Sequence, residues 1–195
     1  MTAKKPVFFI LVFIVLWFFA TFSTSAQLRI VCIGNSITQG KAGIKPDSSY
    51  EFSYRPWLWE KLIKSGFKVD MVGYNPYFFD ESEGNLTMKF ETNSVPFDRN
   101  AEAYYGITSD LFLNGSPSAG WTGAPLPKFS DRINDPKKGY TADIALIHVG
   151  TNDPDSTADQ VEATNQNIRT IVHVLRSKNP SVVVLVAKLI TGWKK

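Results

Sequence analysis

A serine and an asparagine, each directly after a short apolar run, are the residues of this chain best suited to chemistry. Ser36 lies in VCIGNSITQG, after the apolar run at residues 28–33, and Gly34 lets the backbone turn sharply before it. Asn152 lies in GTND, after a second apolar run at residues 143–149. A serine hydroxyl can act as a nucleophile, and an asparagine amide can donate a hydrogen bond to charge that develops on a carbonyl oxygen.

Each motif taken alone is also typical of a turn that ends a strand, because Gly, Ser, Thr, Asn and Asp all suit turns. Together they are more specific. Parallel strands bring their carboxyl ends to one edge of a sheet, and open α/β sheets bind ligands at that edge. We therefore expect Ser36 and Asn152 to lie at the same edge of a parallel sheet.

The two blocks resemble those of the GDSL-like, or SGNH, hydrolase superfamily, whose serine lies in a G-D-S-[IVL]-T-x-G block and whose asparagine lies in a G-x-N-D block. The resemblance extends over nearly all of the chain after residue 27. Asn35 stands where the family has an aspartate, a nearly isosteric change that leaves the nucleophile in place. The resemblance implies an α/β fold for residues 27–195, a three-layer, flavodoxin-like, doubly wound parallel sheet.

A third block, AEAYYGITSDLFLNG at residues 101–115, is similar to the second block of the carbohydrate-esterase branches, H-E-G-x-x-G-[WI]-T-S. Gly106 matches the glycine that donates a backbone N–H in the family. A glycine suits that role because it allows backbone to approach a reacting carbonyl closely. Gly120 in AGWTG is the rival position. Ala101 and Ala103 replace the family's His and first Gly, which leaves the local backbone geometry open.

The chemistry that the resemblance implies is acyl transfer to water. Ser36 would attack an ester carbonyl, and three donors would hold the resulting oxyanion: the N–H groups of Ser36 and Gly106 and the amide of Asn152. The resemblance thus gives Ser36, Gly106 and Asn152 as the catalytic residues. It implies no metal and no cofactor.

The base of this superfamily is a histidine in a D-x-x-H block, and no aspartate of this sequence has a histidine three residues on. His148 lies within the apolar run before GTND, where the family often carries a structural histidine. His173 lies in a predicted helix, offset from its apolar stripe, so we interpret it as a surface residue. Neither is expected to be the base.

Apolar patterning predicts strands that alternate with helices, which implies right-handed crossovers and a doubly wound parallel sheet. The expected strands are residues 28–33, 67–73, 143–149 and 181–190. The expected helices are residues 54–65, a helix from near 108, and a helix from 157 to near 179. The first helix is marked by Ser53 as N-cap, Pro56 in its first turn and Gly66 after its end. The last helix is marked by a capping pair, either Ser156 with Asp159 or Thr157 with Gln160.

The run at residues 181–190 is typical of a strand covered on both faces. As a last element it would leave a long apolar edge strand, a form that proteins avoid. We therefore expect the sequence to be C-terminally incomplete, lacking the last layer of the sheet and the base.

The N-terminus indicates export. Lys4 and Lys5 precede a mostly apolar stretch from Val7, and small residues up to Ala26 suit cleavage before Gln27. This pattern predicts a signal peptide over residues 1–26 and a secreted, periplasmic or extracellular protein. The alternative is an uncleaved membrane anchor, although the apolar run is short against the roughly 20 residues that a spanning helix needs.

Composition narrows the classes of partner. The formal net charge is +3, and Lys4 and Lys5 contribute two of those charges, so no electrostatic argument for nucleic acid remains. The single cysteine, Cys32, excludes an internal disulfide. The sequence has no metal-ligand cluster and no phosphate loop, and it leaves the oligomeric state open.

The substrate is less defined than the reaction. Aromatic residues in predicted loops near the sheet edge could stack on a saccharide: Tyr74, Tyr77, Phe78, Phe79 and Trp121. Those of the first helix, Tyr54, Trp57 and Trp59, are interpreted mainly as core. The resemblance favours an acetyl ester on a polysaccharide, with a small lipid or aryl ester as the alternative. A non-catalytic carbohydrate-binding protein that retained the fold is the second hypothesis.

Overall fold

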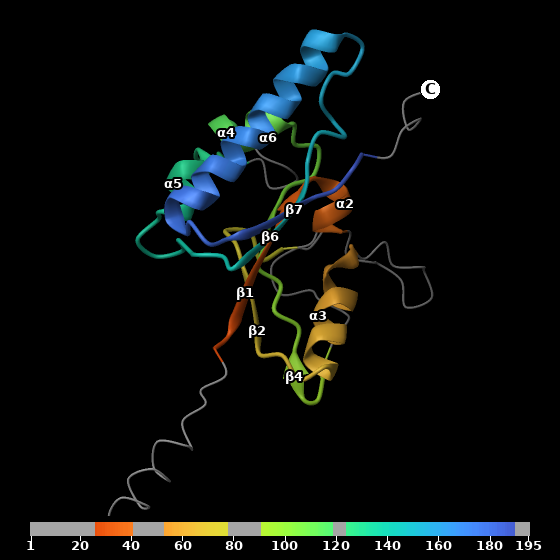
Figure 1. Cartoon of the computed structure of the whole chain (residues 1–195), viewed down its shortest axis with the longest axis vertical. Coiled ribbons are helices and arrows are strands. Elements are labelled where there is room, and N and C mark those ends of the chain that lie inside the picture. Colours follow the sequence, from red (N-terminus) through yellow and green to blue (C-terminus); the bar gives the residue numbers. More distant parts are fainter. Residues whose placement is uncertain (1–25, 41–52, 78–90, 119–123, 190–195) are drawn as a thin grey trace, which may run out of the picture.

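The computed structural model describes residues 26–40, 53–77, 91–118 and 124–189 (Figure 1). Most of the predicted signal peptide lies outside the described residues. So do Gly120, Phe78, Phe79 and Trp121.

Five strands form one parallel sheet, which confirms the predicted α/β class. Its hydrogen-bonded order is β2-β1-β6-β7, and β5 pairs with the end of β1 beyond the point where β2 stops. The strands are β1 (Leu28–Gly34), β2 (Val69–Val72), β5 (Glu102–Ala103), β6 (Ile144–His148) and β7 (Val183–Val186). Because the strands are parallel, their carboxyl ends share one edge of the sheet.

Helices cover both faces of the sheet, as the doubly wound prediction requires. Helix α3 (Tyr54–Lys64) packs Trp59 onto one face, against Ile30 and Cys32 of β1. The other face, with Val31 and Ile33, carries α4 (Ser109–Asn114), α5 (Phe129–Ile133) and α6 (Ala158–Lys178) (Figure 1). The central strand β1 is therefore apolar on both sides, which explains its unbroken hydrophobic run.

The predicted caps of the long helices are confirmed. The Ser53 side chain accepts a hydrogen bond from the N–H of Arg55 at the start of α3. At the start of α6, Thr157 and Gln160 form the reciprocal capping box, and the backbone N–H of Ser156 also donates to Gln160 at 3.0 Å. The alternative pair of Ser156 with Asp159 is therefore wrong.

The short helices and strands were not predicted from the sequence. Helix α2 (Ser36–Gln39), β5 and α5 were not expected. Neither was the hairpin of β3 (Glu91–Thr92) with β4 (Val95–Pro96). Elements of two to five residues are too short to show a period of 2.0 or 3.6. Strand β2 is also shorter than the expected 67–73, because its parallel partner contributes only four paired residues there.

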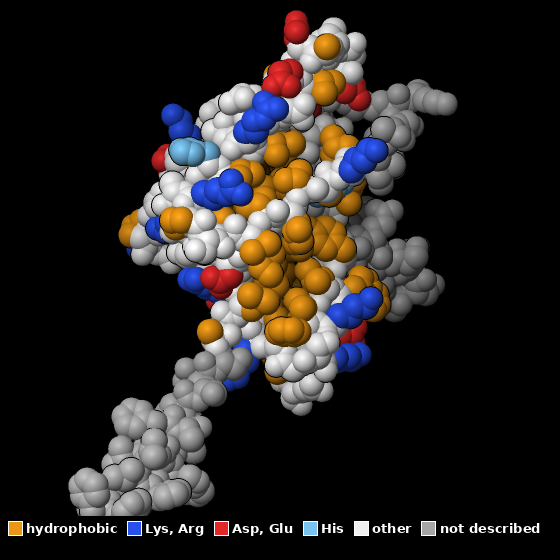
Figure 2. All heavy atoms as spheres, viewed as in Figure 1, with side chains coloured by type: hydrophobic (Ala, Val, Ile, Leu, Met, Phe, Trp, Pro, Cys, Tyr) orange, Lys and Arg blue, Asp and Glu red, His pale blue; other side chains and the backbone are white. Residues whose placement is uncertain are grey.

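Strand β7 is an exposed edge of the sheet within the described residues. Val183, Leu185 and Val186 are 55%, 58% and 50% exposed. Figure 2 shows hydrophobic side chains gathered on this face of the molecule. Within the described ranges, no helix is long and apolar enough to cross a membrane.

Candidate active site

Ser36 begins helix α2 directly after the central strand. Its neighbour Asn35 is the N-cap, with a side-chain oxygen that accepts a hydrogen bond from the N–H of Ile37 at 3.1 Å. An amide oxygen serves this role as a carboxylate would, which gives the Asn35 substitution a structural reason. A Cβ on Gly34 would lie 2.2 Å from Thr38 Oγ1 and 2.6 Å from the His148 carbonyl oxygen, so only glycine fits there.

A buried arginine holds the other end of α2. The Arg55 side chain is inaccessible to solvent and donates to the carbonyl oxygens of Thr38 and Gln39 at 2.8 and 2.7 Å. These carbonyls would otherwise lack partners at the end of so short a helix. Burial lowers the pKa of the Arg55 guanidinium from its usual value. Arg55 thus fixes the helix that Ser36 begins.

Gly106 lies in a tight turn at the end of β5. The N–H of Tyr104 donates to the Gly34 carbonyl at 3.1 Å, which ties this turn to the end of β1, and the N–H of Ile107 closes the turn onto Tyr104 at 3.3 Å. Gly106 has φ of 72° and is exposed. A Cβ there would meet nothing within 4 Å, so the reason for glycine is the left-handed backbone rather than close packing.

Asn152 contacts the Gly106 turn directly. It lies in the exposed turn after β6, and its Nδ2 donates to the carbonyl oxygen of Ile107 at 3.0 Å. An amide NH₂ carries two N–H groups, so this bond uses one and orients the other. The structure therefore brings Asn152 and the Gly106 turn together.

The neighbouring Asp153 fastens the same turn to two helices. Its buried carboxylate accepts hydrogen bonds from the N–H and hydroxyl of Ser109 at the start of α4, and from the Thr164 hydroxyl of α6 at 3.2 Å. Asn167 donates in turn to the Ser109 hydroxyl at 3.0 Å. This network fixes Asp153, next to Asn152, and Ser109, two residues after Ile107, and so supports the contact between Asn152 and Ile107.

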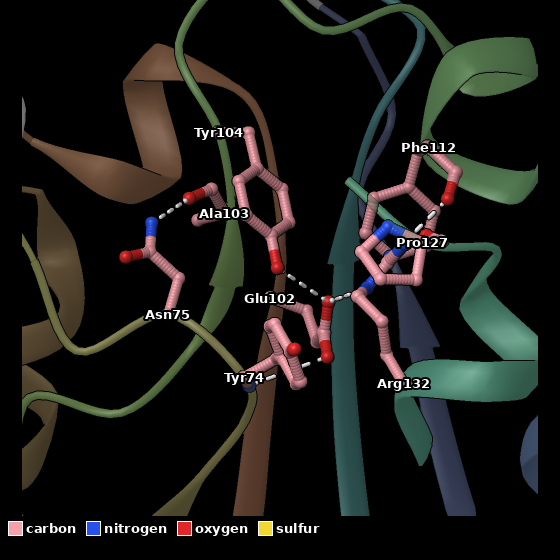
Figure 3. Close-up of polar contacts among 8 residues, drawn as sticks. All are labelled: Tyr74, Asn75, Glu102, Ala103, Tyr104, Phe112, Pro127 and Arg132. Carbon is pink, nitrogen blue, oxygen red and sulfur yellow. Dashed lines mark hydrogen bonds and ion pairs between the residues drawn. The ribbon is translucent and has the colours of Figure 1, made fainter. Parts of the chain in front are cut away.

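A buried ion pair supports β5 beneath the Gly106 turn (Figure 3). Arg132 Nε lies 2.9 Å from Glu102 Oε2, and both side chains are fully buried. The same carboxylate accepts hydrogen bonds from the Tyr104 hydroxyl at 3.1 Å and the Tyr74 N–H at 3.3 Å. Burial raises the pKa of Glu102, and the adjacent Arg132 opposes that shift.

The three predicted site residues all follow carboxyl ends of adjacent strands. Gly34 is paired with both Ala103 of β5 and His148 of β6, so the chain segments that lead to Ser36, Gly106 and Asn152 leave the sheet side by side. One hydrogen bond joins the Asn152 side chain to the Gly106 turn. A serine hydroxyl and N–H donors carried on adjacent segments are the groups that acyl transfer uses.

Two histidines fall within the described ranges, and neither is hydrogen-bonded to Ser36. His148 ends β6 and is partly buried, and His173 is exposed on α6. The described residues also contain no group of three metal-ligating side chains.

Sequence reasoning missed the residues that hold these segments in place. Arg55, Asp153, Glu102 and Arg132 lie in stretches that look like ordinary polar sequence. Two of them carried a signal: Glu102 occupies the glutamate position of the H-E-G block, and Asp153 is the aspartate of the G-x-N-D block.

Comparisons with known proteins point to esterases. No family model matches the sequence. A multidomain esterase from Ruminococcus flavefaciens is 28% identical over 162 residues, which make up 82% of this chain and 18% of that protein. The chain thus spans less than a fifth of that relative.

Two solved structures share the fold with a TM-score of 0.52 each. One is a serine-to-alanine mutant of an acetyl esterase with an acetate ion, 20% identical. The other is a carbohydrate esterase of family 3 from Talaromyces cellulolyticus, 21% identical. In both cases the match covers 82% of this chain and 61% of the other. The expected α/β fold is therefore confirmed, and the proteins that share it are esterases.

Proposed function

We propose that this chain is part of a secreted serine esterase that hydrolyses carboxylic esters, in particular acetyl esters of carbohydrates. The observation that carries the proposal is the arrangement of three segments at one sheet edge, in which the Asn152 amide is bonded to the turn of Gly106 beside the end of β1. The similarity to esterases supports the same reaction class.

In the proposed mechanism, the Ser36 hydroxyl oxygen attacks the ester carbonyl carbon and gives up its proton to a base. The N–H groups of Ser36 and Gly106 and the Asn152 amide stabilise the tetrahedral oxyanion. Collapse of this intermediate breaks the bond to the alcohol, which leaves with a proton, and Ser36 carries the acyl group. Water then attacks the acyl-enzyme and releases the carboxylic acid.

The sequence lacks the general base in the form that the family uses. The resemblance implies a histidine of a D-x-x-H block, and the sequence contains no such block. Without a base, serine is a weak nucleophile. We expect the chain alone to show little turnover.

Chemical rescue tests the nucleophile in the chain as it stands. Imidazole added to the assay should act as the missing base and raise the rate of p-nitrophenyl acetate hydrolysis above that of Ser36→Ala at the same imidazole concentration. In the presence of imidazole, a fluorophosphonate probe should label the chain and not Ser36→Ala. Ser177→Ala, which removes an exposed hydroxyl on α6, is the matched control. Equal rates and equal labelling in all three proteins would refute the assignment.

The second candidate function, a carbohydrate-binding protein without catalysis, is favoured by the missing histidine block. It predicts oligosaccharide binding with no rescue by imidazole and no labelling of Ser36. Secretion is part of the main proposal and rests on the N-terminal pattern. Mass spectrometry of the exported protein should find Gln27 as its first residue; an intact Met1–Ala26 segment would contradict cleavage.

A further inference from the structure

Two exposed tyrosines flank the helix that Ser36 begins. Tyr105 directly precedes Gly106 and is 46% exposed, and Tyr77 lies in the segment after β2 and is 37% exposed. Both segments follow carboxyl ends of strands that pair with β1. A large aromatic side chain buries much apolar area when a ligand covers it. Because it has few rotatable bonds, it loses little conformational entropy on binding.

One buried amide fixes both tyrosine segments. Gln39, the last residue of α2, is 5% exposed. Its Oε1 accepts a hydrogen bond from the Tyr105 N–H at 2.7 Å, and its Nε2 donates to the Tyr77 carbonyl oxygen at 3.3 Å. The two backbones are therefore separated by no more than one amide group and two hydrogen bonds.

A second amide holds the Tyr77 segment against β5. The backbone of Asn75 bridges to Ala101, and its Nδ2 donates to the Ala103 carbonyl oxygen at 2.7 Å, a contact visible in Figure 3. The Asn75 side-chain oxygen accepts from the Tyr77 N–H at 3.1 Å. Both tyrosines are thus presented from backbone that is fixed before any ligand binds, which lowers the entropy lost on binding.

We propose that Tyr77 and Tyr105 form a stacking site for a pyranose ring, the part of the substrate next to the ester that Ser36 would attack. The inference rests on the proposed function for its link to Ser36, but the binding itself does not require catalysis. A pyranose ring has a face of C–H groups that packs on an aromatic ring and a rim of hydroxyls that a phenol can hydrogen-bond.

The ester-bearing sugar would lie on the tyrosines, and its neighbours along a polysaccharide would extend away from the catalytic edge. Positioning by stacking would orient the ester relative to Ser36, since correct orientation of the reacting groups lowers the barrier. A small aliphatic ester would lack this contribution.

Calorimetric titration with xylotetraose and cellotetraose tests the site. The chain should bind at least one of them, and Tyr105→Ala and Tyr77→Ala should each weaken binding on the order of tenfold. Tyr105→Phe should retain most of the affinity, because stacking remains. Phe67→Ala is the matched control: Phe67 is 53% exposed but precedes β2, at the opposite edge of the sheet.

Separate outcomes distinguish the two proposals. Ser36→Ala should bind oligosaccharide as the unmodified chain does. Loss of binding in the tyrosine variants without any imidazole rescue would support the stacking site and refute the esterase. Absence of binding by the unmodified chain at 10 mM ligand, or equal affinity in Tyr105→Ala, Tyr77→Ala and Phe67→Ala, would overturn the stacking site. Tyr105→Leu and Tyr77→Leu replace any alanine variant whose circular dichroism shows unfolding.

Discussion

The side chain of Asn152 donates a hydrogen bond to the backbone carbonyl of Ile107 at 3.0 Å, across 45 residues of sequence. This bond joins the turn after β6 to the turn that contains Gly106. It orients the Asn152 amide and attaches it to the turn that carries the Gly106 N–H. The two predicted oxyanion donors are therefore coupled, and a change at one is expected to displace the other.

With imidazole present as the base, Asn152→Ala should slow fluorophosphonate labelling of Ser36 by about 10²–10³, the usual effect of removing one oxyanion donor. The reason is that the variant loses a donor and also releases the Gly106 turn. Labelling rates followed by gel fluorescence measure the effect. Asn114→Ala is the control, since it removes an exposed amide bonded only to Asp110 within α4; equal slowing in both variants would contradict an oxyanion role.

Arg132→Met should lower the free energy of unfolding by about 3–5 kcal/mol, because it leaves the Glu102 carboxylate buried without its cation. Glu102→Gln combined with Arg132→Met should cost less than the sum of the single changes. Urea denaturation provides the measurement. The matched control is the exposed pair Arg169–Glu162, with side chains 63% and 61% exposed, where Arg169→Met should cost about 0–1 kcal/mol. Similar losses for the two arginines would show that burial is not the cause.

The Asp143 carboxylate should make the free energy of unfolding depend on pH in the acid range. Hydrogen bonds from Arg29 at 2.7–3.0 Å hold the pKa of Asp143 below its usual 3.8. A depressed pKa in the folded state means that this stabilisation is complete above the unfolded pKa and is lost as the pH falls through the folded pKa. The pair is partly exposed, so solvent screening limits the effect to about 1 kcal/mol or less.

Urea denaturation between pH 6 and pH 2 tests this linkage. Asp143→Asn should lower the unfolding free energy at pH 6 and flatten its decline with acid, whereas Asp131→Asn, an exposed carboxylate on α5, should leave the decline unchanged. An unaltered decline in Asp143→Asn would refute the role of the pair.

Leu185→Lys should reduce self-association without lowering the melting temperature. Leu185 is 58% exposed on the edge strand β7, where an apolar side chain favours pairing with other chains and a lysine opposes it. Sedimentation velocity over a range of concentrations measures the effect. Val184→Lys is the contrasting variant, because Val184 packs against the core and its replacement should lower stability. Unchanged association in Leu185→Lys would show that β7 is not the contact.

Long periodic elements could be read from the sequence because their signals are local. The apolar stripe of α6, its Thr157–Gln160 capping box and the unbroken hydrophobic run of β1 depend on residues close in the chain, so they need no tertiary information. The same holds for the turns after β1 and β6, whose Gly, Asn and Ser residues identified both ends of the candidate site. The parallel direction of the strands, though not their order in the sheet, followed from the alternation of strands and helices.

The tertiary structure decided how the turns are joined. Nothing near Arg55, Asp153 or Glu102 in sequence indicates that these charges are buried, because their partners lie far away in the chain and desolvation is a property of the folded interior. The amide of Gln39 is a further case, since its two partners lie in the segments that follow two separate strands. By itself the sequence determined which residues can do chemistry and which segments are strands or helices; only the packed structure decided which of those residues meet, because hydrogen bonds and ion pairs between distant segments form only after the chain has brought them together.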